Sequence, residues 1–425
     1  MSNDQKLKET TPDTPAAKAE EGHGHGDKGG GAAAKKYLIP SNHAWAGIWK
    51  IFVVVALVGA GMTFAGGAMG DLRRFSYSYL VAFAWGVTLA LGGLFFVLVQ
   101  HITNAGWSVT VRRVAEHLSG TIPLFVVLFI PIMLLRKTLY ADWMGPNVAH
   151  AVVAKRGYLN ETFWIVRAIG FFGIWLFLSG RLVQQSREQD ESRSFELTRK
   201  MRALSAPGIP LFALSLTFGG IDWFMTLSPA WFSTMYGVYI FAGAVVSMFA
   251  FLTLVFTRMN TSGLLTTEVN GNHFHDLGKL MFAFTVFWAY IAFAQYLLIW
   301  YANIPEETEF FLHRQTNGWD TVGYTLVIIH FFVPFFLMLS RHTKYWAGPR
   351  AIGAVIILVM HWVDLYWLIM PNHDHHFHLN VLADLGPWLF VMGVMLAYFF
   401  KNLAGAPIIP IGDPRLERSL AHQNA

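Results

Sequence analysis

Long apolar runs alternate with short polar stretches along most of the chain. A transmembrane helix needs about 20 mostly apolar residues, so runs of that length predict membrane spans. Ten runs meet the requirement within a few residues, and they lie near 48–69, 75–100, 119–136, 162–184, 207–227, 233–256, 278–302, 319–340, 349–370 and 382–400. The pattern predicts an all-α polytopic membrane protein whose ten transmembrane helices occupy residues 41–405.

The third run is the weakest of the ten because it is short and contains Pro123 and Pro131. Proline removes a backbone hydrogen bond inside a helix and kinks it, so we expect a bent helix here. The preceding stretch, 101–120, alternates apolar residues with charged ones such as Arg112 and Glu116. That alternation indicates a helix lying at the cytoplasmic membrane interface, and a plain loop is the alternative.

Both ends of the chain are polar. Residues 1–40 are rich in Lys, Glu, Gly, Ala, Thr and Pro and have few large apolar side chains, a composition that buries too little surface to fold alone. We therefore expect a disordered tail there and a second tail at 406–425. Ten crossings place both tails on one side, and Lys and Arg are concentrated in the tails and in the loops of that side. By the positive-inside rule both termini are expected in the cytoplasm.

The composition agrees with a membrane protein and narrows its chemistry. Hydrophobic residues make up 54% of the chain and charged residues 13%, with a mean hydropathy of +0.43. The absence of cysteine excludes disulfides, a thiolate-ligated iron–sulfur cluster and c-type haem attachment in this polypeptide, so any such redox centre belongs to a partner. The net charge of +5 follows from the basic loops on one side, and nucleic acid binding is not implied.

Two halves of the sequence resemble each other. In each half a phenylalanine pair precedes an arginine at the same spacing, and in the following span an aspartate lies seven residues before a proline. The matching groups are Phe171-Phe172 with Arg181, Phe331-Phe332 with Arg341, Asp222 with Pro229, and Asp364 with Pro371. We predict two like-oriented four-helix bundles, helices 2–5 (about 75–227) and helices 6–9 (about 233–370), with helices 1 and 10 peripheral. Chance similarity among Phe-rich and Leu-rich segments is the alternative.

Asp222 lies inside the fifth span, where an ionised side chain is costly. On insertion scales an aspartate at a helix centre costs roughly 2.5 to 3.5 kcal/mol, and intramembrane acids usually take a partner and mark a proton, ion or substrate route. Ser215 and Thr226 share its helix face and extend a polar stripe. Alternatively, Asp222 caps the helix end and the two hydroxyls bond to backbone carbonyls. Arg167, near the outer end of the fourth span, either snorkels or pairs with an acid such as Asp222.

His361 and Asp364 in the ninth span are three residues apart and so lie on one helix face. There the carboxylate can orient the imidazole and the pair can shuttle a proton, whereas a polar pair that only holds two helices together is the alternative. His330 in the eighth span, and Gln295 and Tyr290 in the seventh, are further candidate relays. The predicted proton path therefore comprises Asp222, His330, His361, Asp364, Gln295, Tyr290, Ser215 and Thr226.

The histidines do not form a pattern typical of haem ligands. His375 follows His361 at a separation found in four-helix cytochromes, but it lies beyond Pro371 in the polar run 372–376 and hence outside the membrane. This run and His378 carry enough imidazole for zinc or copper, yet they lack a regular ligand spacing. We therefore predict neither haem nor a metal site, and interpret the loop as a docking surface or simply a hydrated loop.

Three stretches carry a resemblance to a known family. They are Phe218-Gly219-Gly220-Ile221-Asp222-Trp223-Phe224-Met225, the following Ser228-Pro229 with Trp231 to Gly237, and His101-Ile102-Thr103-Asn104-Ala105-Gly106-Trp107. Here the chain resembles ActF, a family of membrane subunits of alternative complex III, the bacterial quinol:cytochrome c (or high-potential acceptor) oxidoreductase. The resemblance covers about residues 40 to 410. That family is related to the ten-helix, NrfD-like membrane anchors of polysulfide and nitrite reductases.

The resemblance implies a protein of the bacterial inner membrane that has no redox centre and no activity alone. It implies partnership with a second, homologous membrane subunit, an iron–sulfur subunit and periplasmic cytochrome c subunits, and these partners would hold the haems and iron–sulfur clusters. Quinol oxidation is assigned mainly to the homologous membrane subunit, while buried polar residues of both are thought to line proton half-channels. Asp222, His330, His361 and Asp364 are the corresponding candidates here, and a quinone or quinol is a possible ligand.

Two other function classes fit the same pattern. A secondary transporter also has internal repeats and polar groups near the midplane, although only Gly219-Gly220 suggests a broken helix in this chain. A purely structural scaffold subunit would tolerate the replacement of Asp222 and Asp364 by asparagine. The residues alone leave these alternatives beside the respiratory subunit.

Overall fold

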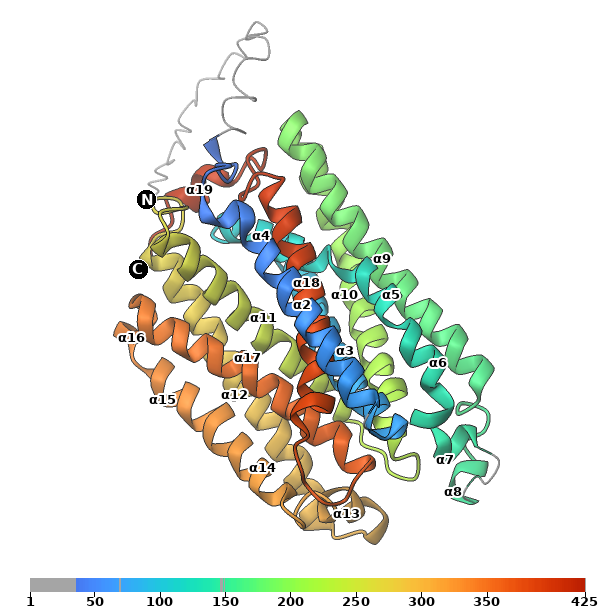
Figure 1. Cartoon of the computed structure of the whole chain (residues 1–425). Coiled ribbons are helices and arrows are strands. Elements are labelled where there is room, and N and C mark those ends of the chain that lie inside the picture. Colours follow the sequence, from blue (N-terminus) through green and yellow to red (C-terminus); the bar gives the residue numbers. More distant parts are fainter. Residues whose placement is uncertain (1–35, 69, 146–147, 149, 425) are drawn as a thin grey trace, which may run out of the picture.

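The long helices of a computed structural model lie side by side, and the structure describes residues 36–68, 70–145, 148 and 150–424 (Figure 1). Most of the predicted disordered tail, 1–35, lies outside the described residues. Within the described part, nine helices are long and apolar enough to cross a membrane, and a bent helix pair is a tenth candidate. The chain is therefore a multi-pass, all-helical membrane protein.

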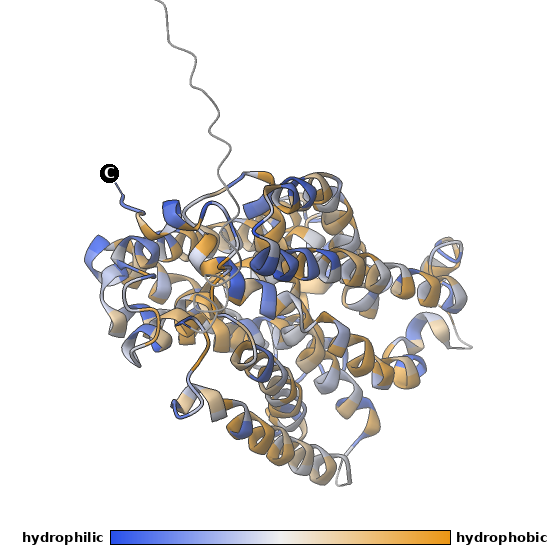
Figure 2. Cartoon of the chain, turned by 90° about the horizontal axis from the view of Figure 1, so that it is seen from above, coloured by the Kyte–Doolittle hydropathy of each residue, from blue (hydrophilic) through white to orange (hydrophobic). Residues whose placement is uncertain are grey.

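The nine helices correspond to nine of the ten predicted spans. Their bounds are α2 (Ala44–Ala68), α3 (Leu72–Ile102), α9 (Glu161–Ser192), α10 (Phe195–Trp223) continued by the 3-10 turn η1 (Met225–Leu227), α11 (Tyr236–Thr261), α12 (Gly271–Ala302), α14 (Trp319–Thr325) with η2 (Leu326–Phe332) and α15 (Val333–Leu339), α17 (Ala347–Ile369) with η3 (Met370–Asn372), and η4 (Val381–Leu385) with α18 (Gly386–Ala404). Seen from above, much of the helical ribbon carries hydrophobic residues, with hydrophilic residues in between (Figure 2).

The centre of the fold is formed by α3 and α11. In their most apolar stretches 94% and 83% of the residues are buried, against 11% in α2. Helix α3 packs against α4 (Val109–Ser119), α10, α11, α17 and α18, and α11 packs against α10, α12 and α17. Polar side chains on α10 and α17 can therefore meet partners on other helices without facing lipid.

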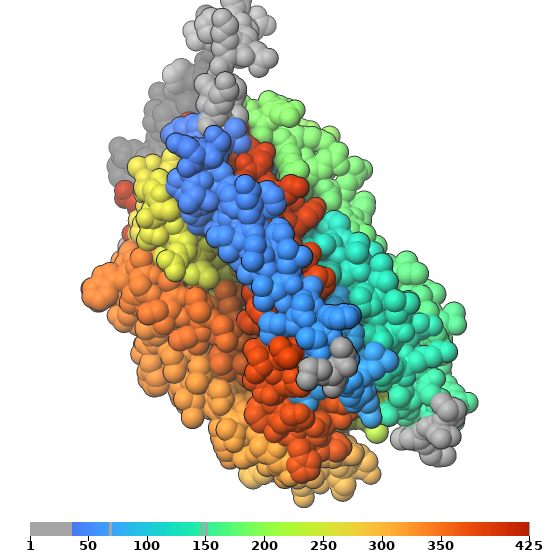
Figure 3. All heavy atoms as spheres, in the orientation of Figure 1, coloured from blue at the N-terminus to red at the C-terminus, as the bar shows by residue number. Residues whose placement is uncertain are grey.

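The first and last spans, α2 and α18, pack closely on each other and lie side by side on one face of the molecule (Figure 3). A Cβ placed on Gly59 would come within 2.3 Å of the backbone nitrogen of Phe390, and one on Gly393 within 2.5 Å of that of Ala56. Small residues at such points let two backbones approach in the membrane, where lipid supplies no hydrophobic drive for association. Helix α18 also packs on α3, whereas α2 faces mostly outward.

The third span is bent, as its prolines predict. Helices α4 (Val109–Ser119) and α5 (Ile122–Leu128) precede α6 (Ile130–Leu139), and the bend before α6 is 55°. Pro131 lies in the first turn of α6, where its missing N–H costs nothing. Two short helices, α7 (Ala141–Met144) and α8 (His150–Val153), lead from there to α9.

A helix forms within 101–120, as expected, and its charged side chains are enclosed by other parts of the chain. Every residue of α4 is buried. The Arg112 guanidinium lies 2.9 Å from a Glu116 oxygen and 2.8 Å from an Asp413 oxygen, so a polar segment is enclosed because its charges neutralise one another. The alternation of apolar and charged residues could not predict that α4 is covered by another segment, since Asp413 lies near the C-terminus of the chain.

The C-terminal segment covers α4. Residues 406–424 with α19 (Leu416–Leu420) cross the end of the molecule at which α2 begins, which we call the N-terminal end. Ser419 donates to the Trp107 carbonyl at 2.6 Å, and His422 lies 2.7 Å from Asp276. Burial raises the pKa of Asp413, but hydrogen bonds from Arg415 and the charge of Arg112 bring it below its ordinary value. The segment is a packed part of the fold.

Helices α9 and α10 extend well past the predicted spans at the N-terminal end. The polar stretch between the spans, residues 185–206, is rich in Gln, Arg and Glu, which favour helix. The two helices meet at Arg193, which adopts a left-handed conformation with φ 50° and ends α9. Ser194 then caps α10 by accepting from the Glu196 N–H. The predicted membrane spans were therefore shorter than the helices.

The eighth span is irregular at its middle. Residues Leu326–Phe332 form a π-helical stretch, η2, directly before α15, with Pro334 in the first turn of α15. Pro334 has no N–H to give to the carbonyl of His330, four residues earlier. Single π-helical turns occur frequently at functional sites, and this one carries His330, a predicted relay.

Candidate functional site

Asp222 is buried completely and is bound to an arginine. Its Oδ2 accepts from the Arg167 Nε at 2.5 Å, and its Oδ1 accepts from the Tyr158 hydroxyl at 2.7 Å. The Arg167 guanidinium also lies over the rings of Tyr158 and Phe163, at 3.9 and 4.3 Å from their centroids. Of the two expectations for Arg167, pairing with Asp222 is the one observed. The carboxylate joins α9 to α10 and caps no helix end.

The hydroxyls predicted to share a stripe with Asp222 bond elsewhere. Thr226 donates to the Asp222 carbonyl at 2.7 Å. Ser215 donates to the Phe212 carbonyl at 3.1 Å and accepts from the Trp175 indole at 2.8 Å. Both hydroxyls satisfy backbone carbonyls, which was the alternative to a proton-conducting stripe. Within the described residues no hydrogen bond links Ser215 to the Asp222 carboxylate.

Asp364 has a different environment. The Tyr239 hydroxyl of α11 donates to its Oδ1, and the Trp288 indole of α12 donates to its Oδ2 at 3.1 Å. The residue is 1% exposed. Both donors are neutral, and within the described chain no lysine or arginine pairs with this carboxyl group. Asp364 is thus buried in the membrane part of the protein without a counter-charge.

His361 does not bond to Asp364, so the expectation that the carboxylate orients the imidazole is wrong for the described structure. Its Nε2 lies 2.9 Å from the Thr88 hydroxyl of α3. Because that hydroxyl gives its single hydrogen to the Ala84 carbonyl at 2.7 Å, it accepts from His361 Nε2–H. Nδ1 then carries the lone pair, and it has no partner in the described chain.

His361 and Asp364 nevertheless face the same small residue. A Cβ built on Gly243 of α11 would lie 3.3 Å from His361 Nδ1 and 3.8 Å from an Asp364 oxygen. A side chain there would come between the two groups. Their common helix face, which the three-residue spacing predicts, is therefore real, although the partners on it come from neighbouring helices.

His330 lies beside this pair of groups. Its ring centroid is 4.2 Å from that of Trp288, edge to face, and its Nδ1 is buried without a partner in the described chain. Trp288 thus contacts both His330 and Asp364. We call Asp364, Tyr239, Trp288, His330 and His361 the Asp364 cluster. It brings together three of the predicted site residues.

The other two predicted relays lie along a groove next to the Asp364 cluster. Gln295 and Tyr290 both line a groove of about 890 Å³ that also includes Tyr239 and Trp288. Gln295 accepts from Ser233 at 3.3 Å, and Tyr290 is 64% exposed. Neither residue bonds to Asp364. They occupy the surface of the groove and not the hydrogen-bonded cluster.

A third buried acid of the membrane spans was missed from the sequence. Asp384 of η4 accepts from Arg74 of α3 at 2.7 Å, from Ser78 at 2.7 Å and from Tyr366 at 2.9 Å, and its side chain is 0% exposed. The signal was present, because an arginine borders the second predicted span and an aspartate lies just inside the tenth. Charges at span ends are ordinary, however, so their pairing was not evident.

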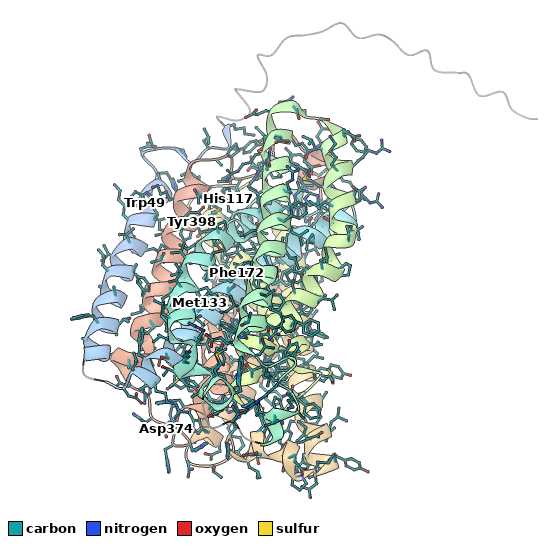
Figure 4. The ribbon with its side chains drawn as sticks, turned by 90° about the vertical axis from the view of Figure 1, so that its right-hand side faces the viewer. Trp49, His117, Met133, Phe172, Asp374 and Tyr398 are labelled. Atoms are coloured by element: carbon teal, nitrogen blue, oxygen red, sulfur yellow. The ribbon has the colours of Figure 1, made fainter. Side chains whose placement is uncertain are left out.

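The histidine-rich run, residues 372–378, follows the ninth span. No group of three or more His, Cys, Asp or Glu side chains able to hold a metal ion occurs among the described residues. His378 lies 2.8 Å from Arg74, and Asp374 accepts from the His376 backbone N–H. Asp374 marks the end of the molecule opposite to His117 and Tyr398 (Figure 4), and we call this the opposite end.

The Arg167–Asp222 pair generates a first prediction. Arg167→Gln leaves the buried Asp222 carboxylate without its cation, and we expect a loss of roughly 3 to 5 kcal/mol in the free energy of unfolding. In Arg167→Gln/Asp222→Asn both charges are absent, and most of the loss is recovered. The measurement is the thermal unfolding midpoint of the detergent-solubilised chain. Equal midpoints for the wild type and Arg167→Gln would show that the pair does not stabilise the fold.

The chain was compared with models of protein families and with curated proteins. No protein-family model matches the chain, and no curated protein matches it. The function is therefore inferred from the geometry of the Asp364 cluster and from the residues that carry the family resemblance. The chain is a multi-pass helical membrane protein. Four acids are buried in the nine described spanning helices: Asp222 and Asp384 pair with an arginine, Asp276 at the start of α12 pairs with Lys279, and Asp364 has no lysine or arginine partner among the described residues.

Proposed function

We propose that the chain is an integral membrane subunit of a respiratory quinol:acceptor oxidoreductase of the alternative complex III type, and that it carries a proton pathway. The resemblance of residues 218–237 and 101–107 to that family supports the complex. In this proposal the chain crosses the bacterial cytoplasmic membrane ten times with both termini inside. A homologous membrane subunit, an iron–sulfur subunit and cytochrome c subunits are its partners and hold the redox centres.

The proposed two-bundle arrangement has support from the helix packing, whereas the ends of the two aspartate-bearing helices do not match. Helix α10 ends at Trp223, one residue after Asp222, and continues as the 3-10 turn η1; α17 ends at Ile369, five residues after Asp364, and continues as η3. The bent span and α9 pack with α3 and α10, while α12, α15 and α17 gather around α11 or one another. These packing partners suit two repeated units, with the Asp364 cluster inside the second.

The observation that carries the proton pathway is the difference between Asp364 and two other acids buried in the spans, Asp222 and Asp384. Asp222 and Asp384 each bind an arginine within 2.7 Å, which fixes them as charged structural groups. Asp364 is held only by a phenol and an indole. Burying a carboxylate without a counter-ion is costly, and gaining a proton removes that cost. A group that can change between these two states is what a proton route requires.

The neighbouring imidazoles extend the route on either side of Asp364. His361 Nδ1 and His330 Nδ1 are buried and unpaired in the described chain, so each can accept a proton without breaking a hydrogen bond. His361 Nδ1 and an Asp364 oxygen both lie within 4 Å of the position that a Cβ on Gly243 would occupy. A direct hydrogen bond or a bridging water at this position would let a proton pass between them. We leave Asp222, Ser215 and Thr226 out of this proposed route, because Arg167 pairs with Asp222 and both hydroxyls donate to backbone carbonyls.

A scaffold subunit is the main alternative, and the arginine pairs favour it for Asp222 and Asp384. It does not explain Asp364, because a scaffold gains nothing from a buried carboxyl group that has no counter-charge. A secondary transporter remains the other candidate. It would function as a single chain, whereas the proposed subunit depends on its partners.

The second prediction concerns Asp364→Asn. Asparagine keeps the shape and can still accept from Tyr239, but it cannot exchange a proton. In membranes containing the assembled complex we expect quinol:cytochrome c turnover, or the number of protons released per electron, to fall; a turnover loss of roughly 10²-fold is typical of a missing proton acceptor. Both quantities are measured in the same membranes after co-purification has confirmed assembly.

The matched control for this experiment is Asp142→Asn, since Asp142 is an exposed acid at the opposite end. Its turnover and proton yield should equal those of the wild type. If Asp364→Asn also equals the wild type while the complex assembles, the subunit is a scaffold and the proposed proton pathway is wrong. Vectorial transport by the chain purified without partners would favour the transporter.

The third prediction uses Gly243→Ala. The added methyl group would lie 3.1 Å from His361 Cε1 and 3.3 Å from His361 Nδ1. It would therefore occupy the position that faces both the His361 imidazole and the Asp364 carboxyl group. We expect a lower proton yield. These contacts are tighter than ordinary van der Waals contact, so the His361 ring must shift slightly, and the higher helix propensity of alanine offsets part of that cost; the unfolding midpoint is measured alongside. The control is Gly170→Ala, whose new methyl group meets nothing within 4 Å. Equal proton yields for both variants would exclude a route through Gly243.

A further inference from the structure

The groove beside the Asp364 cluster opens toward the lipid. It lies between α12, α14 and η2, has a volume of about 890 Å³, and is lined mainly by apolar and aromatic side chains. Three of these, Tyr290, Phe293 and Tyr324, are 60 to 66% exposed on the membrane-facing side. A molecule dissolved in the bilayer can therefore enter from the side without crossing the protein.

Arg314 forms part of the groove wall and is unusual for a buried cation. It is 2% exposed, and its side chain donates to the carbonyls of Phe310, Trp367 and Leu368 at 2.7 to 3.1 Å. No acid pairs with it in the described chain, in contrast to Arg74 and Arg167. A guanidinium group has five N–H donors, so donors remain after these three bonds.

Other donors lie along the same groove. The Trp367 indole N–H is buried and has no acceptor in the described chain. The Gln295 side chain also reaches the groove. Tyr239 and Trp288 line its inner part and hold Asp364 with their own hydrogens. The polar wall of this apolar groove is thus rich in donors, and the ligand that suits it carries acceptor oxygens on a lipophilic body.

We propose that the groove binds the ring of a membrane-soluble quinone, with its carbonyl oxygens accepting from Arg314 and Trp367 and its apolar tail lying toward the lipid. The volume lies within the range of roughly 300 to 1,000 Å³ that small-molecule sites occupy. The position places the ring next to Tyr239 and Trp288, the two residues that hold Asp364. The choice of a quinone rests on the proposed function, while the groove and its donors do not.

A phospholipid is the competing occupant, and the charges of the groove disfavour it. A phosphate group attracted to Arg314 would also approach Asp320, which lines the same groove. The remaining polar lining is neutral, and burying a phosphate against neutral groups costs more than burying a carbonyl oxygen. A neutral ring with two acceptors avoids this cost.

The experiment uses the full chain in nanodiscs and a benzoquinone with one isoprenyl unit as the probe. Trp288 and Trp367 line the groove, so bound quinone should quench tryptophan fluorescence in a saturable way. Ala292→Phe fills the groove, and we expect the saturable affinity to fall roughly tenfold or more because the added ring takes the place of the ligand. Ala289→Leu, also in the lining, serves as the second filled variant, and unfolding midpoints show that both variants fold.

The matched control is Ala283→Phe, which adds the same ring to an exposed position of α12 outside the groove. Its affinity should equal that of the wild type. Wild-type affinity in both filled variants would overturn the proposal. The proposal would also be overturned if native mass spectrometry found a phospholipid bound to the wild type that the quinone does not displace and that is absent from Ala292→Phe. If the quinone binds but Asp364→Asn has the wild-type proton yield, the proton pathway is wrong and the quinone site is supported. If the quinone does not bind but Asp364→Asn lowers the proton yield, the quinone site is wrong and the proton pathway is supported.

Discussion

The cost of holding a charge away from water determines how the polar residues of this protein are arranged. Asp222 and Asp384 lie at membrane depth only because Arg167 and Arg74 neutralise them at contact distance. At the N-terminal end, α4 is buried for the same reason, with Arg112 held between Glu116 and Asp413. Removing one member of such a pair leaves a buried charge uncompensated, so these contacts bind distant parts of the chain to one another.

Asp364 and Arg314 are buried without an ion pair among the described residues, as is Arg350 at the other end of α17, but only Asp364 and Arg314 lie beside the groove. Asp364 is bound by Tyr239 and Trp288, and Arg314 by backbone carbonyls and by the face of the Phe310 ring. A fold that neutralises its other buried acids at this end and leaves these two groups without ion pairs keeps an energetic cost that stability alone does not explain. A proton exchanged by the acid and a ligand oxygen facing the cation would explain it. The two roles meet at Tyr239 and Trp288, which touch both the acid and the groove.

The sequence was sufficient for nine of the ten spans, for the bend at Pro131 and for the burial of Asp364, because each follows from local composition or spacing. It was insufficient wherever a partner comes from a distant segment. The three-residue spacing of His361 and Asp364 correctly gives a shared helix face, but the partners of that face are Thr88, Tyr239 and Trp288 on three other helices. For the same reason the burial of α4 under the C-terminal segment and the Arg74–Asp384 pair could not be predicted.

The most direct test of the central claim is an infrared difference spectrum of the assembled complex, recorded before and after quinol addition. If Asp364 exchanges a proton during turnover, a carbonyl band of a protonated carboxylic acid changes in the wild type, persists in Asp142→Asn and disappears in Asp364→Asn. A spectrum in which Asp364→Asn retains that band, or in which the wild type shows none, would contradict the claim and leave Asp364 a structural residue.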